Sequence, residues 1–249
     1  MKVAFFKLPG VVELREQPVP EPREGEVLVQ VLSCGICGTD AEAFRHHQSD
    51  WHRRGHEYSG RIVQVGPKVT AMSEGDLVSG IGSVPCFQCG SCQKGHFSLC
   101  SHPIGFGGDA FAEFLCKPAQ FFFPIPDLTA EEGALMEPLT VAMDLVRDGN
   151  VRSDSLVVLL GAGPIGLMTI PLAKQQGAQV LVIHPYASKR RWRLALQWGA
   201  DAVFHPDKED VVENIRNIAP EGVDSVLVTI KPSIGIPVAV DMCKVGGTI

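Results

Sequence analysis

The sequence lacks the long apolar segments that export or anchor a chain. Only four apolar residues stand between Lys2 and Lys7, too few for the core of a signal peptide. The longest uncharged run, residues 156–173, contains three glycines and two prolines, so a strand, a turn and a helix explain it better than a membrane span. Internal repeats and low-complexity tracts are absent too. We therefore expect a cytoplasmic protein that does not cross a membrane.

The sequence also lacks an excess of basic residues. Lys and Arg number 22 against 28 Asp and Glu, which gives a formal net charge of −6 at pH 7. An acidic chain has no general attraction for nucleic acid or for an anionic membrane, so neither is an expected partner. The hydrophobic fraction of 45% is ordinary for a globular protein, and 249 residues favour two domains. The expected partner is a small molecule.

Short strands are predicted for the first half of the chain. Up to about residue 125, runs such as VLVQVL, RIVQVG and FAEFL alternate with Pro and Gly, as in antiparallel sheets. From Thr129 the period becomes helical, because Thr129 and Glu132 can form a capping box and apolar residues recur at helical spacing up to Gly149. We predict that this helix joins a domain of residues 1–150 to a second domain of residues 151–249.

Strands and helices alternate in the second half. The strand runs LVVLL, VLVI, AVF and VDSVLV are each followed by a helical pattern. The expected helices cover residues 164–176, 188–198, 207–219 and 233–244. Such alternation predicts a parallel sheet with right-handed crossovers. A doubly wound dinucleotide fold normally has six strands, and only four precede the final VGGTI, so we expect this domain to be incomplete at its C-terminus.

A glycine-rich turn, GAGPIG at residues 161–166, follows the first of these strands and opens a helix. In that context Gly161 permits a tight turn, Gly163 lets backbone amides approach a pyrophosphate, and Gly166 lets the helix pack close to the strand. The first helical residues, Pro164 and Ile165, belong to a helix N-terminus that favours an anion. The alternative is a strand, turn and helix without a ligand.

The acidic residue of an NAD site is missing from its expected place. No Asp or Glu occurs between residues 178 and 200, where such a site accepts a hydrogen bond from the ribose 2′-hydroxyl. His184 or Tyr186 ends the second strand instead. A basic run follows it: Lys189, Arg190, Arg191 and Arg193. These bases can neutralise a 2′-phosphate, so NADP is favoured over NAD, unless they form the solvated face of an amphipathic helix.

Four cysteines stand within fifteen residues in CFQCGSCQKGHFSLC, at Cys86, Cys89, Cys92 and Cys100. Their spacing suits four thiolates around one tetrahedral metal ion. A disulfide framework is the weaker interpretation, because thiols stay reduced in the cytoplasm. A second set comprises Cys37 of CGICGTD with His56 and Glu57 of RGHEY, which together offer the ligands of a catalytic zinc with an open position. Taken alone, a Cys and a His so far apart are more often unrelated.

In their order along the chain, CGICGTD, GHE, the four-cysteine segment, FAEF, EPL and GAGPIG resemble the zinc-dependent medium-chain dehydrogenase/reductase (alcohol dehydrogenase) family, near its sorbitol and threonine dehydrogenase-like members. The resemblance implies an α/β protein with a GroES-like, mostly β catalytic domain and a Rossmann domain with a doubly wound parallel sheet. It also implies two zinc ions per chain, a structural one at the four-cysteine segment and a catalytic one. The residues implied around the catalytic ion are Cys37, His56, Glu57 and Glu137, with either glutamate as the third ligand. Thr39 would hydrogen-bond the alcohol and begin a proton relay.

By the same resemblance, the expected activity is hydride transfer between a secondary alcohol, polyol or sugar and a nicotinamide cofactor, with zinc as the Lewis acid. The family's last Rossmann strands lie beyond this sequence, so the alternative is a truncated, non-catalytic protein that binds zinc and nucleotide. A homo-oligomer is expected of a full-length relative. A zinc ribbon that recognises nucleic acid is a third reading, disfavoured by the acidic balance. The resemblance does not identify the alcohol.

Overall fold

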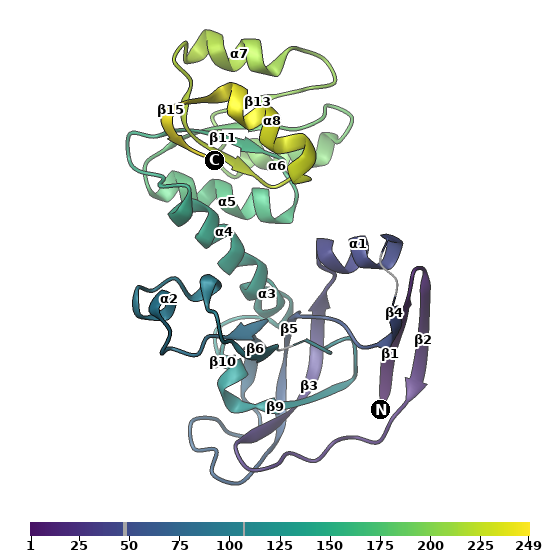
Figure 1. Cartoon of the computed structure of the whole chain (residues 1–249). Helices are drawn as coiled ribbons and strands as arrows, with labels where there is room; N and C mark the ends of the chain where they lie inside the picture. Colours follow the sequence, from purple (N-terminus) through teal and green to yellow (C-terminus); the bar gives the residue numbers. More distant parts are fainter. Residues whose placement is uncertain (47–48, 107) are drawn as a thin grey trace. The chain divides into compact units, whose positions relative to one another are not determined.

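The chain forms two compact units, Met1–Glu137 and Pro138–Ile249, in the computed structural model, which describes residues 1–46, 49–106 and 108–249 (Figure 1). The first unit is mostly β and the second alternates strands with helices, as predicted. The expected boundary at residue 150 differs from this division. It lies after the end of helix α4 (Met136–Asp148), whereas the compact units divide near the start of that helix.

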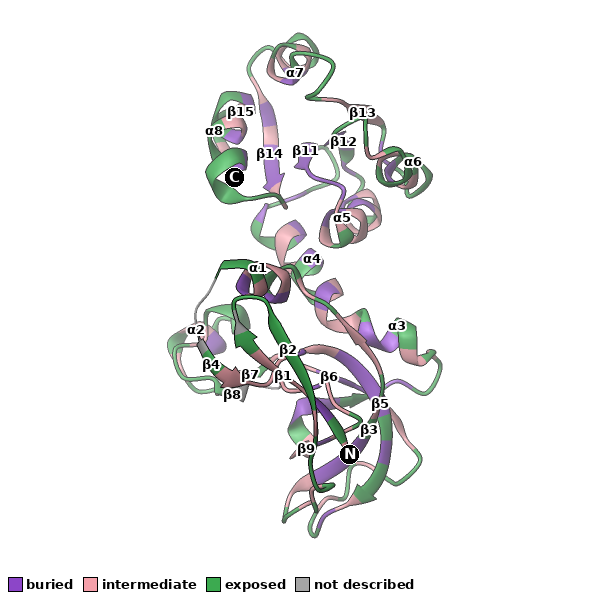
Figure 2. Cartoon of the chain, turned by 90° about the vertical axis from the view of Figure 1, so that its right-hand side faces the viewer, coloured by how far each residue is buried: buried purple, intermediate pink, exposed green. Residues whose placement is uncertain are grey.

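A five-stranded antiparallel sheet forms the centre of the first unit, with strand order β10-β6-β5-β3-β9. Its strands are β3 (Glu26–Gly35), β5 (Glu57–Val65), β6 (Leu77–Gly80), β9 (Phe114–Pro118) and β10 (Phe122–Pro124). Each of β3 and β5 has three consecutive buried residues, 27–29 and 58–60, followed by positions of mixed exposure, and Val27, Val29 and Ile62 lie in the core (Figure 2). The antiparallel strands predicted from VLVQVL and RIVQVG are therefore present, and part of each is buried on both faces.

Smaller elements surround this sheet. They are β1 (Lys2–Leu8), β2 (Val11–Glu16), α1 (Gly38–His46), β4 (Ser49–His52), β7 (Ser83–Val84), α2 (Gly90–Gln93), η1 (Phe97–Leu99), β8 (Ile104–Phe106) and η2 (Ala119–Phe121). Strands β2, β1 and β4 form a second antiparallel sheet, and β7 pairs with β8. Helix α1 starts shortly after β3 ends, so the sheet fixes where that helix begins.

The helix predicted between Thr129 and Gly149 is present but divided. The capping box of Thr129 and Glu132 forms as expected at the start of α3 (Ala130–Ala134). Leu135 then interrupts the helix before α4. Pro138 explains the interruption, because a proline lacks the N–H of a helical hydrogen bond and its ring clashes with the carbonyl four residues earlier.

The second unit contains a parallel sheet with strand order β13-β12-β11-β14-β15. The strands are β11 (Leu156–Leu160), β12 (Gln179–Ile183), β13 (Ala202–Phe204), β14 (Val223–Val228) and β15 (Cys243–Thr248). The helices are α5 (Pro164–Gln175), α6 (Lys189–Gln197), α7 (Val211–Ile218) and α8 (Pro232–Met242). This is the order of a doubly wound fold, in which a ligand binds at the carboxyl end of the first strand. Four of the five residues of β11 and four of the six residues of β14 are buried (Figure 2).

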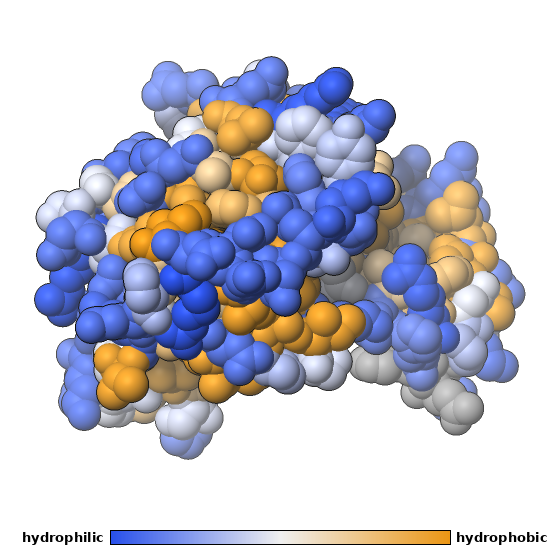
Figure 3. All heavy atoms as spheres, turned by 90° about the horizontal axis from the view of Figure 1, so that it is seen from above, coloured by the Kyte–Doolittle hydropathy of each residue, from blue (hydrophilic) through white to orange (hydrophobic). Residues whose placement is uncertain are grey.

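The surface of the second unit carries apolar side chains among polar ones (Figure 3). Large exposed apolar residues include Ile234, Val240 and Val245. Within the described ranges, every helix is too short or too polar to cross a bilayer.

Candidate functional site

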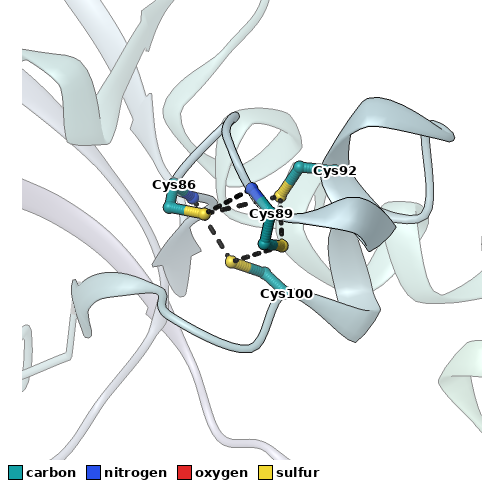
Figure 4. Close-up of side chains that lie close together, drawn as sticks. All are labelled: Cys86, Cys89, Cys92 and Cys100. Atoms are coloured by element: carbon teal, nitrogen blue, oxygen red, sulfur yellow. Dashed lines mark hydrogen bonds between the residues drawn. The ribbon is translucent and has the colours of Figure 1, made fainter.

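The side chains of Cys86, Cys89, Cys92 and Cys100 converge on one point in the lobe around α2 (Figure 4). The Sγ atoms of Cys89 and Cys92 lie 3.4 Å apart, those of Cys86 and Cys92 3.9 Å, and those of Cys89 and Cys100 4.0 Å. Four thiolates that bind a tetrahedral zinc at about 2.3 Å lie about 3.8 Å from one another. All eight cysteines of the chain are free thiols. The donor set and its spacing therefore fit one metal ion rather than disulfides.

Backbone amides of the lobe prepare this cluster for a cation. The N–H of Cys89 donates to Sγ of Cys86 at 3.4 Å, and the N–H of Cys86 donates to Sγ of Cys100 at 3.3 Å. Hydrogen bonds from the backbone of Cys92 and then Ser101 lower the pKa of Cys89 to about 5. Burial raises the pKa of Cys92 to about 12. Without a metal the cluster is therefore partly protonated, and metal binding releases the remaining protons.

The second set of predicted ligands comes together at the ends of β3 and β5. The antiparallel register pairs Gly35 with Glu57 and so brings the segment after β3 beside the start of β5. One ligand atom each from Cys37, His56 and Glu57 lies within 4.8 Å of the other two. A Cβ on Gly35 would lie 2.4 Å from Oε2 of Glu57, so a larger residue there would displace the carboxylate from its place across the strand end.

Cys37 and His56 form a polarised pair. The pKa of Cys37 lies below its ordinary value, chiefly because of its hydrogen bond with His56; burial opposes this, and Thr39 assists through its hydroxyl and its amide. The same hydrogen bond raises the pKa of His56 to about 9. The Cys37 thiolate is thus paired with a protonated His56. A metal cation bound by both residues would take the place of the imidazolium proton.

Glu137, the fourth residue expected here, is near this group but not a member of it. Its side chain is close enough to sense the charges of His56 and Glu57, and burial raises its pKa. Among the residues that the structure describes, the mutually close set contains Glu57 and not Glu137. Thr39 lies exposed in the first turn of α1, and both its hydroxyl and its amide form hydrogen bonds with the Cys37 thiol.

Two polar residues of this region were not predicted. Asp40, in the first turn of α1, accepts a hydrogen bond from the N–H of Cys37, and Arg54 forms an ion pair with Asp40. The capping rule offered a signal for Asp40, because an acidic third residue of a helix commonly accepts from the N–H of the residue that precedes the helix. Nothing local in the sequence connects Arg54 to Asp40.

The glycine turn has the conformation that a phosphate site requires. Gly161 has φ +107°, which favours glycine, and a Cβ on Gly166 would lie 2.1 Å from the carbonyl oxygen of Gly161. A Cβ on Gly163 would have no described atom within 4 Å. Gly163 is the N-cap of α5 and offers no side chain to the first-turn amides, which are therefore available to an anion. Pro164, Ile165 and Gly166 form that first turn.

Thr229, another residue that was not predicted, forms hydrogen bonds with the backbone at the start of this turn. Its hydroxyl group lies within hydrogen-bond distance of two carbonyl oxygens, 2.9 Å from that of Leu160 and 3.1 Å from that of Gly161. Its amide donates to the carbonyl of Leu160 at 3.0 Å. The residue stands directly after β14, so the neighbouring strand fixes where β11 ends and the turn begins.

His184 follows β12 and contacts the glycine turn. The residue is only 8% exposed, and Nδ1 of its imidazole accepts a hydrogen bond from the N–H of Ala162 at 3.2 Å. Burial, then the charges of Arg191 and His205, lower the pKa of His184, so the ring is neutral and accepts at Nδ1. Tyr186 lies beyond it, with its ring stacked on Trp192 at 6.0 Å between centroids.

Lys189 and Arg190 open helix α6 and are both exposed. The Nζ atom of Lys189 lies 5.7 Å from the centroid of the Tyr186 ring. Both bases are thus near the carboxyl end of β12 and accessible to a ligand. Their exposure agrees equally with a solvated helix face.

Two family models match most of the chain. The model of the alcohol dehydrogenase GroES-like domain matches residues 23–127, and the model of the zinc-binding dehydrogenase matches residues 164–249. The chain is 38% identical over 235 residues to L-threonine 3-dehydrogenase of Pyrococcus horikoshii, which covers 89% of this chain and 67% of that enzyme. It is 32% identical over 263 residues to D-xylulose reductase A of Aspergillus oryzae, covering 98% and 73%. It spans 64 to 67% of the length of the Pyrococcus threonine dehydrogenases.

Solved structures are similar over the whole chain. A protein of Sinorhizobium meliloti 1021, described as a zinc-binding dehydrogenase and bound to NADP, has a TM-score of 0.88 and 33% identity over 99% of this chain and 74% of its own. Galactitol-1-phosphate dehydrogenase of Escherichia coli has a TM-score of 0.84 and 29% identity, covering 98% and 72%. The similarity therefore extends over both compact units.

Proposed function

The chain belongs to the family of zinc-binding alcohol dehydrogenases with a GroES-like domain, and on this premise we propose that it is a zinc-dependent oxidoreductase. The proposed reaction transfers a hydride between a secondary alcohol, polyol or sugar and a nicotinamide cofactor. The observation that carries the proposal is the cluster of Cys37, His56 and Glu57 in a chain that also has a glycine turn at a helix N-terminus. The names of its relatives, which include threonine and galactitol-1-phosphate dehydrogenases, agree with a small hydroxylated substrate.

The four-cysteine cluster is the proposed structural zinc site. Four thiolates complete a tetrahedron and leave no position for a substrate. Structural zinc sites in small peptides contribute about 10–16 kcal/mol of apparent binding free energy, which is also folding free energy. The lobe between β7 and β8 contains few buried apolar side chains, with Cys92 one of them, so we expect its order to depend on the metal.

The cluster at the ends of β3 and β5 is the proposed catalytic zinc site. Cys37 and His56 supply two ligands, and the carboxylates of Glu57 and Glu137 are the candidates for the third. A zinc ion bound there by three residues would act as a Lewis acid on an alcohol oxygen at its open position. Of the two carboxylates, that of Glu57 has an oxygen within 4.8 Å of the donor atoms of Cys37 and His56.

Thr39 is the proposed contact for the substrate hydroxyl. It is exposed at the start of α1, and its own hydroxyl already lies against the Cys37 thiol. A hydroxyl can accept a proton from one neighbour while it donates to another, so Thr39 can pass the proton of the alcohol towards solvent.

The turn before α5 is the proposed site of the cofactor's pyrophosphate. Gly163 leaves room for a close approach, and the first-turn amides of α5 can donate to the phosphate oxygens. NADP is proposed in preference to NAD, because neutral His184 stands where an NAD site has a carboxylate, and Lys189 and Arg190 can pair with a 2′-phosphate. The relative from Sinorhizobium meliloti that is bound to NADP supports this choice.

Metal content and nucleotide affinity test the proposal together. We expect two zinc ions per chain by elemental analysis, tighter fluorescence-detected binding of NADPH than of NADH, and NADP reduction with at least one secondary alcohol or polyol. A chain that keeps one zinc and reduces no cofactor with any of these substrates would contradict the catalytic proposal.

Substitutions separate the two metal sites. Cys37→Ser should remove one zinc and the activity but leave NADPH binding intact. The matched control is Cys116→Ser, because Cys116 is half-buried and belongs to neither cluster. Glu57→Gln and Glu137→Gln compare the two carboxylates, and the true ligand is the one whose loss lowers zinc content. Two retained zinc ions in Cys37→Ser would exclude Cys37 as a ligand.

A further inference from the structure

Asp40 is a buried carboxylate that contacts both segments of the Cys37–His56 site. Only 5% of its side chain is exposed. Its Oδ2 atom accepts a hydrogen bond from the N–H of Cys37 at 3.1 Å, and its Oδ1 atom accepts one from Nε of Arg54 at 2.8 Å. Arg54 stands two residues before His56 in the chain. The ion pair therefore ties the segment that precedes α1 to the segment that precedes β5.

Arg54 makes further contacts between the same two segments. Its Nη2 atom donates to the carbonyl of Thr39 at 3.4 Å, and its Nη1 atom lies 3.5 Å from Nε2 of His52. Its own carbonyl accepts the N–H of Phe111 at 3.0 Å. Only 21% of the Arg54 side chain is exposed, so the guanidinium is held in place rather than extended into solvent. A planar guanidinium with several donors can bridge two segments at once, which a single ammonium cannot do.

The pair also balances charge next to the proposed ligands. Glu57 and Glu137 already add two carboxylates to the surroundings of His56. Without Arg54, the buried Asp40 would lose its ion-pair partner, and a buried carboxylate that loses its partner tends to move towards water. Because Asp40 also holds the backbone of Cys37, such a movement would displace the Cys37 thiol from His56.

We propose that Arg54 is a positioning residue which, through Asp40, keeps Cys37 at the distance from His56 that a shared metal ion requires. The proposal rests on the proposed zinc-dependent function. Arg54 acts on the carboxylate of Asp40 and on the carbonyl of Thr39. Removing a residue that orients metal ligands typically lowers metal affinity about 10–100-fold, and we expect Arg54→Met to do so at one of the two sites.

The test compares Arg54→Met and Arg54→Lys with the control Lys68→Met. Lys68 also forms an ion pair, with Glu24 at 2.6 Å, but the side chains of Lys68 and Glu24 are 75% and 61% exposed. Ion pairs so exposed contribute little to stability. Zinc affinity is measured by competition with a chromophoric chelator, and ligand geometry by the visible spectrum of the cobalt(II)-substituted protein. We expect Arg54→Met to weaken one site and alter the cobalt spectrum, and Lys68→Met to change neither. Equal affinities and spectra in these two variants would overturn the proposal.

Arg54→Lys keeps the test decisive if Arg54→Met does not fold. A lysine ammonium can pair with Asp40 but cannot also reach the carbonyl of Thr39, so we expect partial rescue of metal affinity. Full equality of Arg54→Lys with the native chain in both affinity and cobalt spectrum would show that charge alone is needed and would overturn the positioning role.

A readout without metal at this site separates the inference from the proposed function. In protein that holds zinc only at the four-cysteine cluster, the rate of Cys37 alkylation by iodoacetamide is followed by mass spectrometry. We expect the rate in Arg54→Met to differ from that in Lys68→Met, because the Cys37 thiol then stands in a changed position relative to His56. If the native chain binds a single zinc, the proposed function fails, and equal alkylation rates would overturn the positioning role independently.

Discussion

Gly163 and Gly166 stand three residues apart in one turn, and we predict that alanine at the two positions has opposite consequences. Gly166→Ala places a Cβ 2.1 Å from the carbonyl oxygen of Gly161 and 3.1 Å from Oγ1 of Thr229. Both contacts are with atoms that the parallel sheet holds in place, so we expect overpacking to cost about 1–3 kcal/mol of unfolding free energy. Gly163→Ala meets no described atom within 4 Å, and its φ of −72° suits alanine. It should therefore leave stability unchanged or raise it by about 0.4–1 kcal/mol.

In cofactor binding, by contrast, Gly163→Ala should be the more damaging of the two variants. A methyl group on Gly163 occupies the space through which a pyrophosphate approaches the α5 amides, so NADPH affinity should fall about tenfold or more, which corresponds to about 1.4 kcal/mol. Urea unfolding gives the stability of each variant, and fluorescence titration gives its Kd for NADPH. Native affinity in a stable Gly163→Ala protein would refute the assignment of the pyrophosphate to this turn.

Three further predictions concern the cysteine lobe and His184. Cys89→Ser should remove one zinc and lower the thermal stability of the first unit, whereas Cys116→Ser should do neither; elemental analysis and calorimetry decide, and unchanged zinc in Cys89→Ser would refute the structural site. His184→Asp should change the ratio of Kd values in favour of NADH by about tenfold, because a carboxylate accepts from the ribose hydroxyl and repels a 2′-phosphate; an unchanged ratio would contradict this role. The folded pKa of His184 lies below the unfolded value of 6.5, mainly through burial, so its stabilising contribution is complete above pH 6.5 and is lost as the pH falls through the folded pKa. Urea unfolding of the native chain and of His184→Gln at about pH 7 and about pH 5 should show a steeper loss in the native chain.

Three strands of the second unit could be predicted from sequence to the residue. LVVLL, AVF and VDSVLV coincide with β11, β13 and β14, because short runs rich in Val, Leu and Phe favour strands. Most of β11 and β14 is buried, whereas the residues of β13 are half-buried. Helix starts were harder to predict. The helix expected from residue 207 begins at Val211, since Asp210 is its N-cap and accepts from the amide of Glu213 at 3.1 Å. The Asp207 carboxylate instead accepts from the amide of Tyr186 at 2.7 Å, a contact between distant segments.

In the candidate sites too, contacts between residues close in sequence could be predicted, and contacts between distant segments could not. The cysteine cluster lies within fifteen residues, so spacing alone indicated a tetrahedral site. Asp40 and Arg54 are fourteen residues apart and meet only because α1 and the start of β5 are placed side by side by the sheet. Thr229 supports the glycine turn from a different strand. Neither contact has a periodicity or motif that a single sequence displays.

The two metal clusters therefore differ in what each requires of the fold. The four-cysteine site is closed by a short loop, and its amide-to-sulfur hydrogen bonds link Cys89 to Cys86 and Cys86 to Cys100. The site at Cys37 and His56 needs the register of β3 and β5, the glycine at position 35 and the pair of Asp40 and Arg54. Closing a short loop costs little entropy, whereas the second site forms only after long-range pairing. A metal ion can thus order the lobe locally, but the proposed catalytic ligands are assembled by the sheet, which makes the geometry of that site a direct report on whether the first unit is correctly folded.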